Sequence, residues 1–383
     1  MTQSNWSVPE TEVLRTISAR LEADRSTVLA TVVDVEGNAY RRPGAKMLLT
    51  PDGEGIGSIT AGCLEDDLLR VARTVRAEGR PRLETYDLME DEEDVWGLGV
   101  GCNGVIEVLL EPLGASYRPA IEAFADGRDV ASVTVLDSDA AGLECGDRAH
   151  FHPETDGFEG VSGTYPAWLF EKLTRPAEEL ARRGRADTLE LEGTGGRVRV
   201  FVDGIAAPTE LYVFGSGHDV GPVTELASLN DFRVTVVGFR GAVDLEERFP
   251  SAARTVTTSP GSLREPLGLD DRSHAVVMTH NFVDDRLAVD ELLRSPVPYV
   301  GVMGPRDRFE EMLAEFDAEG RTFTENELAR LYTPVGLDLG GGSPYQIAHS
   351  IVGEVLAVSN GREPRHLKTR EGSIHDRLDI DAE

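Results

Sequence analysis

The first third of the chain alternates between helical and strand-like patterns of apolar residues. Residues 11–24 place their apolar side chains three and four positions apart, which predicts an amphipathic helix. The run VLATVVDVEG then predicts a strand, and YRRPGAKMLLTPDGEGIGSIT predicts a hairpin broken by Pro-Gly and Asp-Gly. A helix after Gly62 and strands in RLETYDL and GVIEVLLEPL follow. We therefore expect a mixed α+β domain over residues 1–116.

The middle third, residues 117–205, has a weaker pattern. ASVTVLD and RVRVFVDG predict strands, and PAWLFEKLTRPAEELARRG contains helical stretches interrupted at proline. No chemistry stands out in this segment. We expect it to complete the first domain and to link that domain to the second.

From Glu210 onward, strands and helices alternate regularly. LYVFGSGHDVG predicts a buried strand, a glycine turn and a helix start, and FRVTVVGFR predicts the next strand. HAVVMTH and PYVGVMG predict two further strands, each followed by a helix. Such alternation is typical of a doubly wound parallel sheet. The predicted fold class is therefore α/β, with a Rossmann-like domain over residues 206–360 after the α+β domain and a polar tail over 361–383.

The last predicted helix begins after the glycines at 340–342. Ser343 and Gln346 have the spacing of a capping box, and Pro344 suits the first helical position. The N–H groups of this helix start could bind an anion, or the glycines could form only a tight loop.

The charge balance is strongly acidic. The chain has 38 basic and 68 acidic residues, a net charge of −30, and lysine occurs only three times. Because the acidic residues are spread along the whole chain, we interpret them as a halophilic adaptation to a salt-rich cytoplasm; docking to a basic partner is the alternative. High salt screens repulsion between acidic groups. No basic patch suggests nucleic-acid binding.

Two further features lead us to expect a cytoplasmic protein. No signal peptide opens the chain, and no apolar run reaches the roughly 18 residues of a membrane span. Three cysteines cannot all form disulfides with one another, and their spacing matches no zinc site. We therefore expect a reducing compartment.

The glycine turn of the second domain is a candidate phosphate site. Gly215, Gly217 and Gly221 would let a phosphate approach N–H groups at a helix N-terminus, and His218 lies inside the turn. An NAD site usually has an acidic residue at the end of the next strand, where this chain has Gly238. That difference disfavours NAD(P). A close helix–strand crossing is the structural alternative.

Two more candidates follow strands of the same domain. His280 comes just after HAVVMT, and Arg306 comes just after GVMGP. Ligands of doubly wound sheets bind at the carboxyl ends of the strands. His280 could donate to a phosphate or transfer a proton, and Arg306 could bind a negative group. Either residue could instead have a purely structural role.

The first domain offers two thiols. Cys63 lies where a helix begins, and helix N–H groups lower the pKa of a thiol, although two aspartates in the same turn oppose this effect. Glu65 is a further candidate in that turn. Cys102 lies among glycines in GVGCNGV, whereas Cys145 has no such setting and is expected to be structural. Either candidate thiol could also be a small buried apolar residue.

The stretch RRPGAKM adds basic side chains. Lys46 is one of three lysines in a chain that otherwise uses arginine, which suggests that it has a role. Together with Arg42 it could contact a phosphate or another acidic ligand group. A solvated hairpin is the alternative.

Taken together, these motifs resemble the XdhC/CoxI family, the accessory factors of xanthine dehydrogenase and carbon monoxide dehydrogenase. The first domain is similar through YRRPGAKMLLTPDG, GSITAGCLEDDLL and WGLGVGCNGVIEVLLEP. The second is similar through LYVFGSGHDVGPV, VVMTHNFVDD, YVGVMGPRDR and TPVGLDLGGGSPYQIAHSIVGEVLAV. These stretches lie in the family's order, and only the middle third and the tail are not covered.

The resemblance implies a molybdenum cofactor chaperone with no turnover of its own. Such a protein would bind the molybdopterin cofactor, protect it during sulfuration by a cysteine desulfurase, and insert it into a xanthine dehydrogenase-type client. Cys63 and Cys102 would contact the molybdenum or its sulfur, and the glycine turn would bind the phosphate. The family resemblance further implies a homodimer.

Two other functions remain open at this stage. One is an NAD(P)-dependent Rossmann oxidoreductase, which requires the acidic residue that Gly238 replaces. The other is a scaffold that bridges the desulfurase and the client without binding the cofactor.

Overall fold

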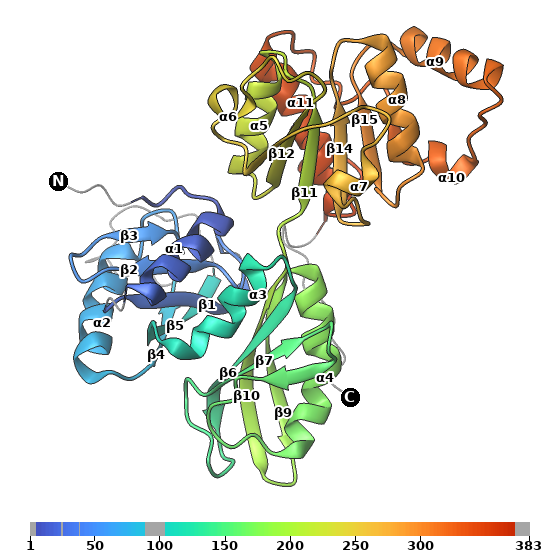
Figure 1. The fold of residues 1–383 in the computed structure, drawn as a ribbon. Coiled ribbons are helices and arrows are strands. Elements are labelled where there is room, and N and C mark those ends of the chain that lie inside the picture. The colour runs from blue at the N-terminus through green and yellow to red at the C-terminus, as the bar shows by residue number, and fades with distance from the viewer. Residues whose placement is uncertain (1–4, 24–25, 38, 89–103, 372–383) are drawn as a thin grey trace. The chain divides into compact units, whose positions relative to one another are not determined.

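The computed structural model describes residues 5–23, 26–37, 39–88 and 104–371 (Figure 1). It divides the chain into two compact units: unit 1 is Met1–Ala207 with Glu371–Glu383, and unit 2 is Pro208–Arg370. Unit 1 contains two antiparallel sheets, and unit 2 contains one parallel sheet. None of the helices in the described ranges is long and apolar enough to cross a membrane.

The first half of unit 1 is an antiparallel sheet with two helices, drawn in blue and cyan in Figure 1. Its elements are α1 (Glu10–Glu22), β1 (Val28–Gly37), β2 (Lys46–Leu49), β3 (Gly55–Gly57), α2 (Glu65–Glu78), β4 (Arg82–Asp87) and β5 (Gly104–Pro112). The strands lie in the order β3-β2-β1-β5-β4. The helices and strands expected here are confirmed.

The middle third forms a second sheet rather than additional strands of the first. Its elements are a 3₁₀ turn (Ala115–Tyr117), α3 (Arg118–Ala125), β6 (Val130–Ser138), β7 (Arg148–His152), β8 (Gly157–Glu159), α4 (Ala167–Arg183), β9 (Ala186–Gly193) and β10 (Gly196–Ile205). The expected interruption at proline is wrong, because α4 continues through Pro176. The buried face of α4, which includes Leu173, Ala177 and Leu180, packs on the sheet and stabilises the helix despite the missing N–H.

The two halves of unit 1 are copies of one topology. Each runs helix, three strands, helix, two strands, and each sheet has the order third-second-first-fifth-fourth. Each first strand carries one extra residue at the same place, Val33 in one half and Leu136 in the other. Gly79 and Gly184 end the second helix of the respective half in the left-handed conformation. Unit 1 is therefore an internal repeat.

Two buried ion pairs join the halves in a reciprocal way. Lys46 on β2 lies 2.9 Å from Asp203 on β10, and Arg148 on β7 lies 2.6 Å from Glu111 on β5. Both cations face a threonine of the first strand of their own half, so their positions are equivalent in the repeat. The two acidic residues are equivalent as well, because each pairs with the first strand two residues before that threonine. The contact thus resembles the interface of a symmetric dimer.

A neutral histidine lies beside this interface and predicts acid sensitivity. His150 is fully buried, its Nε2 lies 2.7 Å from the carbonyl oxygen of Ser116, and burial lowers its pKa from 6.5 to about 4. Below pH 6.5 the unfolded chain therefore binds a proton that the folded chain does not. The stability contributed by neutral His150 should fall from pH 6.5 to about 4, at up to about 1.4 kcal/mol per pH unit.

Urea unfolding at pH 7 and pH 5 measures this effect. The loss of unfolding free energy between the two pH values should be smaller in His150→Gln than in the wild type. His349→Gln, which changes an exposed histidine, is the control. An unchanged pH dependence in His150→Gln would contradict the prediction.

Unit 2 is a doubly wound parallel sheet, which confirms the predicted fold class. Its elements are β11 (Glu210–Phe214), α5 (Val220–Leu229), β12 (Arg233–Gly238), α6 (Leu245–Arg248), β13 (Arg254–Thr257), α7 (Arg264–Leu267), β14 (Ser273–Val277), α8 (Phe282–Leu293), β15 (Tyr299–Val302), α9 (Arg306–Ala318), α10 (Glu325–Leu328), β16 (Leu331–Tyr332) and α11 (Pro344–Ser359). The strand order is β13-β12-β11-β14-β15-β16. The strand order reverses between β11 and β14, from which the sheet grows in opposite directions, and ligands of such sheets bind at that switch point.

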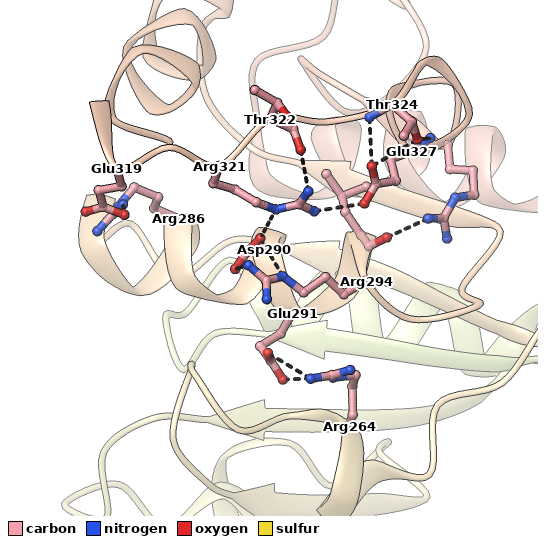
Figure 2. Close-up of polar contacts among 12 residues, drawn as sticks. Arg264, Arg286, Asp290, Glu291, Arg294, Glu319, Arg321, Thr322, Thr324 and Glu327 are labelled. Atoms are coloured by element: carbon pink, nitrogen blue, oxygen red, sulfur yellow. Dashed lines mark hydrogen bonds and ion pairs between the residues drawn. The ribbon is translucent and has the colours of Figure 1, made fainter. Parts of the chain in front are cut away.

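Arg321 is the centre of an ion-pair network in unit 2 (Figure 2). Its guanidinium lies 2.8 Å from both Asp290 and Glu327 and also donates to the carbonyl oxygen of Thr322. Thr324 and Arg321 lower the pKa of Glu327 to about 2. The network fixes the segment before β16. This segment lies at the amino ends of the parallel strands, away from the carboxyl ends where ligands bind. It therefore belongs to the scaffold.

Candidate functional site

The loop that carries Cys63 is closed by a buried clasp between Thr60 and Glu65. The Thr60 hydroxyl lies 2.9 and 2.8 Å from the two carboxylate oxygens of Glu65, and the Thr60 amide donates to Oε1 at 3.3 Å. The Leu64 amide donates to Oε2 at 3.0 Å. Glu65 has no exposed surface. Its carboxylate is therefore used within the loop, and a direct contact with a ligand would require breaking the clasp.

Cys63 lies between the two ends of this clasp. Its amide donates to the Thr60 hydroxyl at 3.1 Å, and its half-buried side chain packs against the core under α2. The negative charge of Asp67 in the same turn is balanced by Arg70 at 2.6 Å. The structure thus places a thiol directly before the helix N-terminus, with its backbone held on both sides.

The other candidates of unit 1 differ in position. The ammonium group of Lys46 is buried against Asp203 and donates to the carbonyl oxygen of Gly44 at 2.9 Å, so the predicted contact with an anion would require breaking this ion pair. Arg42 is exposed on the hairpin. Cys102 lies outside the described residues. Among those residues, no three His, Cys, Asp or Glu side chains are grouped as metal ligands.

Cys145 differs from Cys63 in its electrostatic setting. Burial, followed by the charge of Glu111, raises the pKa of its thiol to about 11. A thiol that stays protonated at neutral pH is a poor nucleophile and a poor metal ligand. Cys145 is therefore suited to packing, and it offers a matched control for Cys63.

In unit 2, the glycine turn lies at the switch point of the sheet. A Cβ at Gly215 would lie 2.7 Å from the carbonyl oxygen of Met278, so glycine is required where β11 passes the end of β14. A Cβ at Gly221 would meet nothing within 4 Å. The structural alternative thus accounts for Gly215 and leaves Gly221 unexplained.

His280 is brought to the same turn from β14. Its Nε2 lies 2.6 Å from Oδ2 of Asp219, and its backbone has a φ of 59°, which is uncommon for a residue other than glycine. A Cβ at Gly217 would lie 2.4 Å from Oδ1 of Asp219. Asp219 is not among the residues predicted from the sequence, although GSGHDVG places it at the start of the helix. His218 is exposed on the turn.

The remaining candidates lie at the same edge of the sheet. Arg306 begins α9 after β15, is largely exposed, and lies 3.6 Å from Glu310. The predicted capping box is confirmed: Oε1 of Gln346 accepts from the amides of Gly342 and Ser343, at 3.0 and 3.2 Å. Because Gln346 uses these two amides, neither needs an anion.

Comparisons with known proteins cover both units. The model of the XdhC and CoxI family matches residues 20–87, and that of the XdhC Rossmann domain matches residues 211–355. A protein from Bacillus subtilis (strain 168), described as a probable xanthine dehydrogenase subunit, is 29% identical over 344 residues, 89% of this chain and 95% of that protein. The molybdenum cofactor insertion chaperone PaoD from Escherichia coli (strain K12) is 30% identical over 102 residues, 26% of this chain and 31% of PaoD.

A solved structure extends the likeness to the fold. The crystal structure of a xanthine dehydrogenase from Bacillus halodurans has a TM-score of 0.72 with this chain and 28% sequence identity. The match covers 92% of this chain and 96% of the other. Both units therefore have counterparts in a protein of known structure.

Proposed function

Because the chain belongs to the XdhC and CoxI family, we propose that it is an accessory factor that binds molybdenum cofactor and delivers it to a xanthine dehydrogenase-type enzyme. The cofactor is cargo, and the protein is a carrier with no turnover of its own. The observation that supports this proposal most directly is the clasped loop, which presents Cys63 at a helix N-terminus.

The donor chemistry of Cys63 suits this cargo. A thiolate is a soft ligand, appropriate for molybdenum or for a sulfur atom bound to it. The helix N–H groups stabilise a thiolate beside them. Because Asp67 is paired with Arg70, its charge opposes this effect less than the sequence suggests. In this proposal Cys63 contacts the cargo, and Cys102 is a second contact carried over from the family resemblance.

Unit 2 carries further proposed contacts with the cofactor. His280, His218 and the glycines of the turn are the proposed contacts, and Arg306 is a further one at the same edge of the sheet. We also propose, from the family resemblance, that sulfuration by a cysteine desulfurase takes place while the cargo is bound. A homodimer is proposed on the same ground, and a cytoplasmic location is proposed from the sequence features described above.

Metal retention tests the proposed function. The chain is co-expressed with the molybdenum cofactor pathway and purified, and its molybdenum content and the fluorescence of its oxidised pterin are measured. We expect both signals in the wild type and in Cys145→Ser, and neither in Cys63→Ser. Absence of both signals from the wild type would contradict the proposal, and equal retention in Cys63→Ser would favour a scaffold that does not bind the cofactor.

We further propose that the acidic surface is an adaptation to high salt. A net charge of −30 is self-repelling, and this repulsion is screened as ionic strength rises. The midpoint of thermal unfolding should therefore increase with KCl concentration up to the molar range. A midpoint that is independent of KCl would contradict the adaptation and leave docking to a basic partner as the explanation.

A further inference from the structure

The switch point of unit 2 carries a histidine–carboxylate pair, Asp219 and His280. Asp219 directly precedes α5, a position from which aspartate commonly caps a helix, yet its side chain makes no capping bond. Its Oδ2 lies instead 2.6 Å from Nε2 of His280. Two segments 61 residues apart are thus joined where a ligand of this fold would bind.

This pair presents acceptors to an incoming ligand. Because Asp219 accepts from Nε2 of His280, neutral imidazole has its lone pair on Nδ1. No residue in the described part of the chain hydrogen-bonds to that nitrogen or to Oδ1 of Asp219. That Oδ1 lies over Gly217, 2.4 Å from where a Cβ would be. Beside the glycine turn, the pair therefore presents Oδ1 of Asp219, which can only accept, and Nδ1 of His280, which accepts when the imidazole is neutral.

The same arrangement disfavours a phosphate on the turn. A diphosphate bound over Gly217 would approach the Asp219 carboxylate, and like charges at short range repel strongly. Of two nearby arginines, Arg240 is paired with Asp284 at 2.7 Å, whereas Arg248 donates to the carbonyl oxygen of Ser216, within the turn, at 2.7 Å. The Asp219 carboxylate therefore opposes a diphosphate at Gly217, while Arg248 places a positive charge beside Ser216.

We propose that Asp219 and His280 select a ring edge rich in N–H donors, the 2-amino-4-oxopyrimidine edge of a pterin, and reject a nucleoside diphosphate. The preference for donors comes from the geometry, and the choice of a pterin rests on the proposed function. A carboxylate that accepts N–H bonds from such an edge makes strong charge-assisted hydrogen bonds. Asp219 is then the residue that determines specificity in unit 2, and the phosphate of the cargo lies away from Gly217.

Fluorescence titration of the full chain tests this assignment. The probes are 6-hydroxymethylpterin, which carries the ring edge without metal or phosphate, and NADH, which carries a diphosphate. The wild type should bind the pterin, and Asp219→Asn should bind it about ten-fold more weakly or worse. His280→Phe should weaken it similarly. The wild type should bind NADH more weakly than it binds the pterin. In Asp219→Asn the difference between the two dissociation constants should be smaller.

The control is Asp317→Asn, which removes one exposed carboxylate from the last turn of α9 and should leave both affinities unchanged. The proposal is overturned if the wild type does not bind the pterin, if Asp219→Asn binds it as tightly, or if the wild type prefers NADH. These outcomes are separable from failure of the proposed function. Metal retention that depends on Cys63, with no dependence of pterin binding on Asp219, would leave the carrier intact and remove only this site.

Discussion

Replacing Asp203 with leucine should lower the free energy of unfolding of unit 1 by about 3–5 kcal/mol, because a buried cation then loses its partner. Lys46 would keep only the carbonyl oxygen of Gly44 as an acceptor, with no counter-charge. The Tyr117 hydroxyl, 3.3 Å from Asp203, would lose its acceptor as well. In the Lys46→Met, Asp203→Leu double variant both charges are absent, and most of the loss should be recovered.

Tryptophan fluorescence during urea unfolding measures this difference. Trp6, Trp96 and Trp168 are the only tryptophans and all precede Pro208, so the signal reports on unit 1. The exposed pair Arg182 and Glu178 is the control, and breaking it should cost less than about 1 kcal/mol. A double variant as unstable as Asp203→Leu alone would show that the reciprocal pairs do not act as charge pairs.

Replacing Glu65 with alanine should abolish cofactor retention as completely as Cys63→Ser, although Glu65 does not touch the cargo in the clasped loop. The Thr60 hydroxyl and the amides of Thr60 and Leu64 would lose their acceptor. Each buried donor left without a partner costs about 1–3 kcal/mol, so the loop should open rather than remain unsatisfied. Cys63 would then be presented without a fixed backbone.

The rate of reaction of Cys63 with a thiol reagent, measured in a Cys102→Ser, Cys145→Ser background, separates positioning from simple instability. The reaction rate should be higher in Glu65→Ala than with Glu65 present. In Glu65→Gln, which retains one acceptor oxygen, the rate should lie between these two values. Glu78→Ala, at the exposed end of the same helix, should change neither reactivity nor retention. If Glu65→Ala retains the cofactor, then the clasp is irrelevant to the cargo.

Unit 2 was predicted well because the motifs that define it are formed by residues close together in the sequence. The alternation of strands and helices, the glycine turn and the capping box at Ser343 each lie within a few tens of residues. The pairing of Asp219 with His280 could not be predicted in this way, because it depends on the strand order bringing two distant segments together. The turn was identified, but the side chain that covers it was not.

Unit 1 was harder to predict because its defining feature is a repeat with little sequence similarity. Lysine in one half corresponds to arginine in the other, and glutamate corresponds to aspartate, so charge is kept while identity is lost. Lys46 stood out by its rarity, but its partner lies 157 residues away. Glu65 was identified as a candidate, and only the contacts show that its carboxylate faces its own loop.

The repeat also bears on how the protein can change. In a symmetric dimer every substitution at the interface occurs twice, so each side chain must be compatible with its own copy. Fusing two copies into one chain removes that coupling. One half can then acquire a reactive loop such as that of Cys63, while the corresponding segment before α4 carries Tyr165 and Pro166 instead. A single polypeptide can therefore keep the two reciprocal ion pairs of the contact, while only one of its halves acquires a functional site.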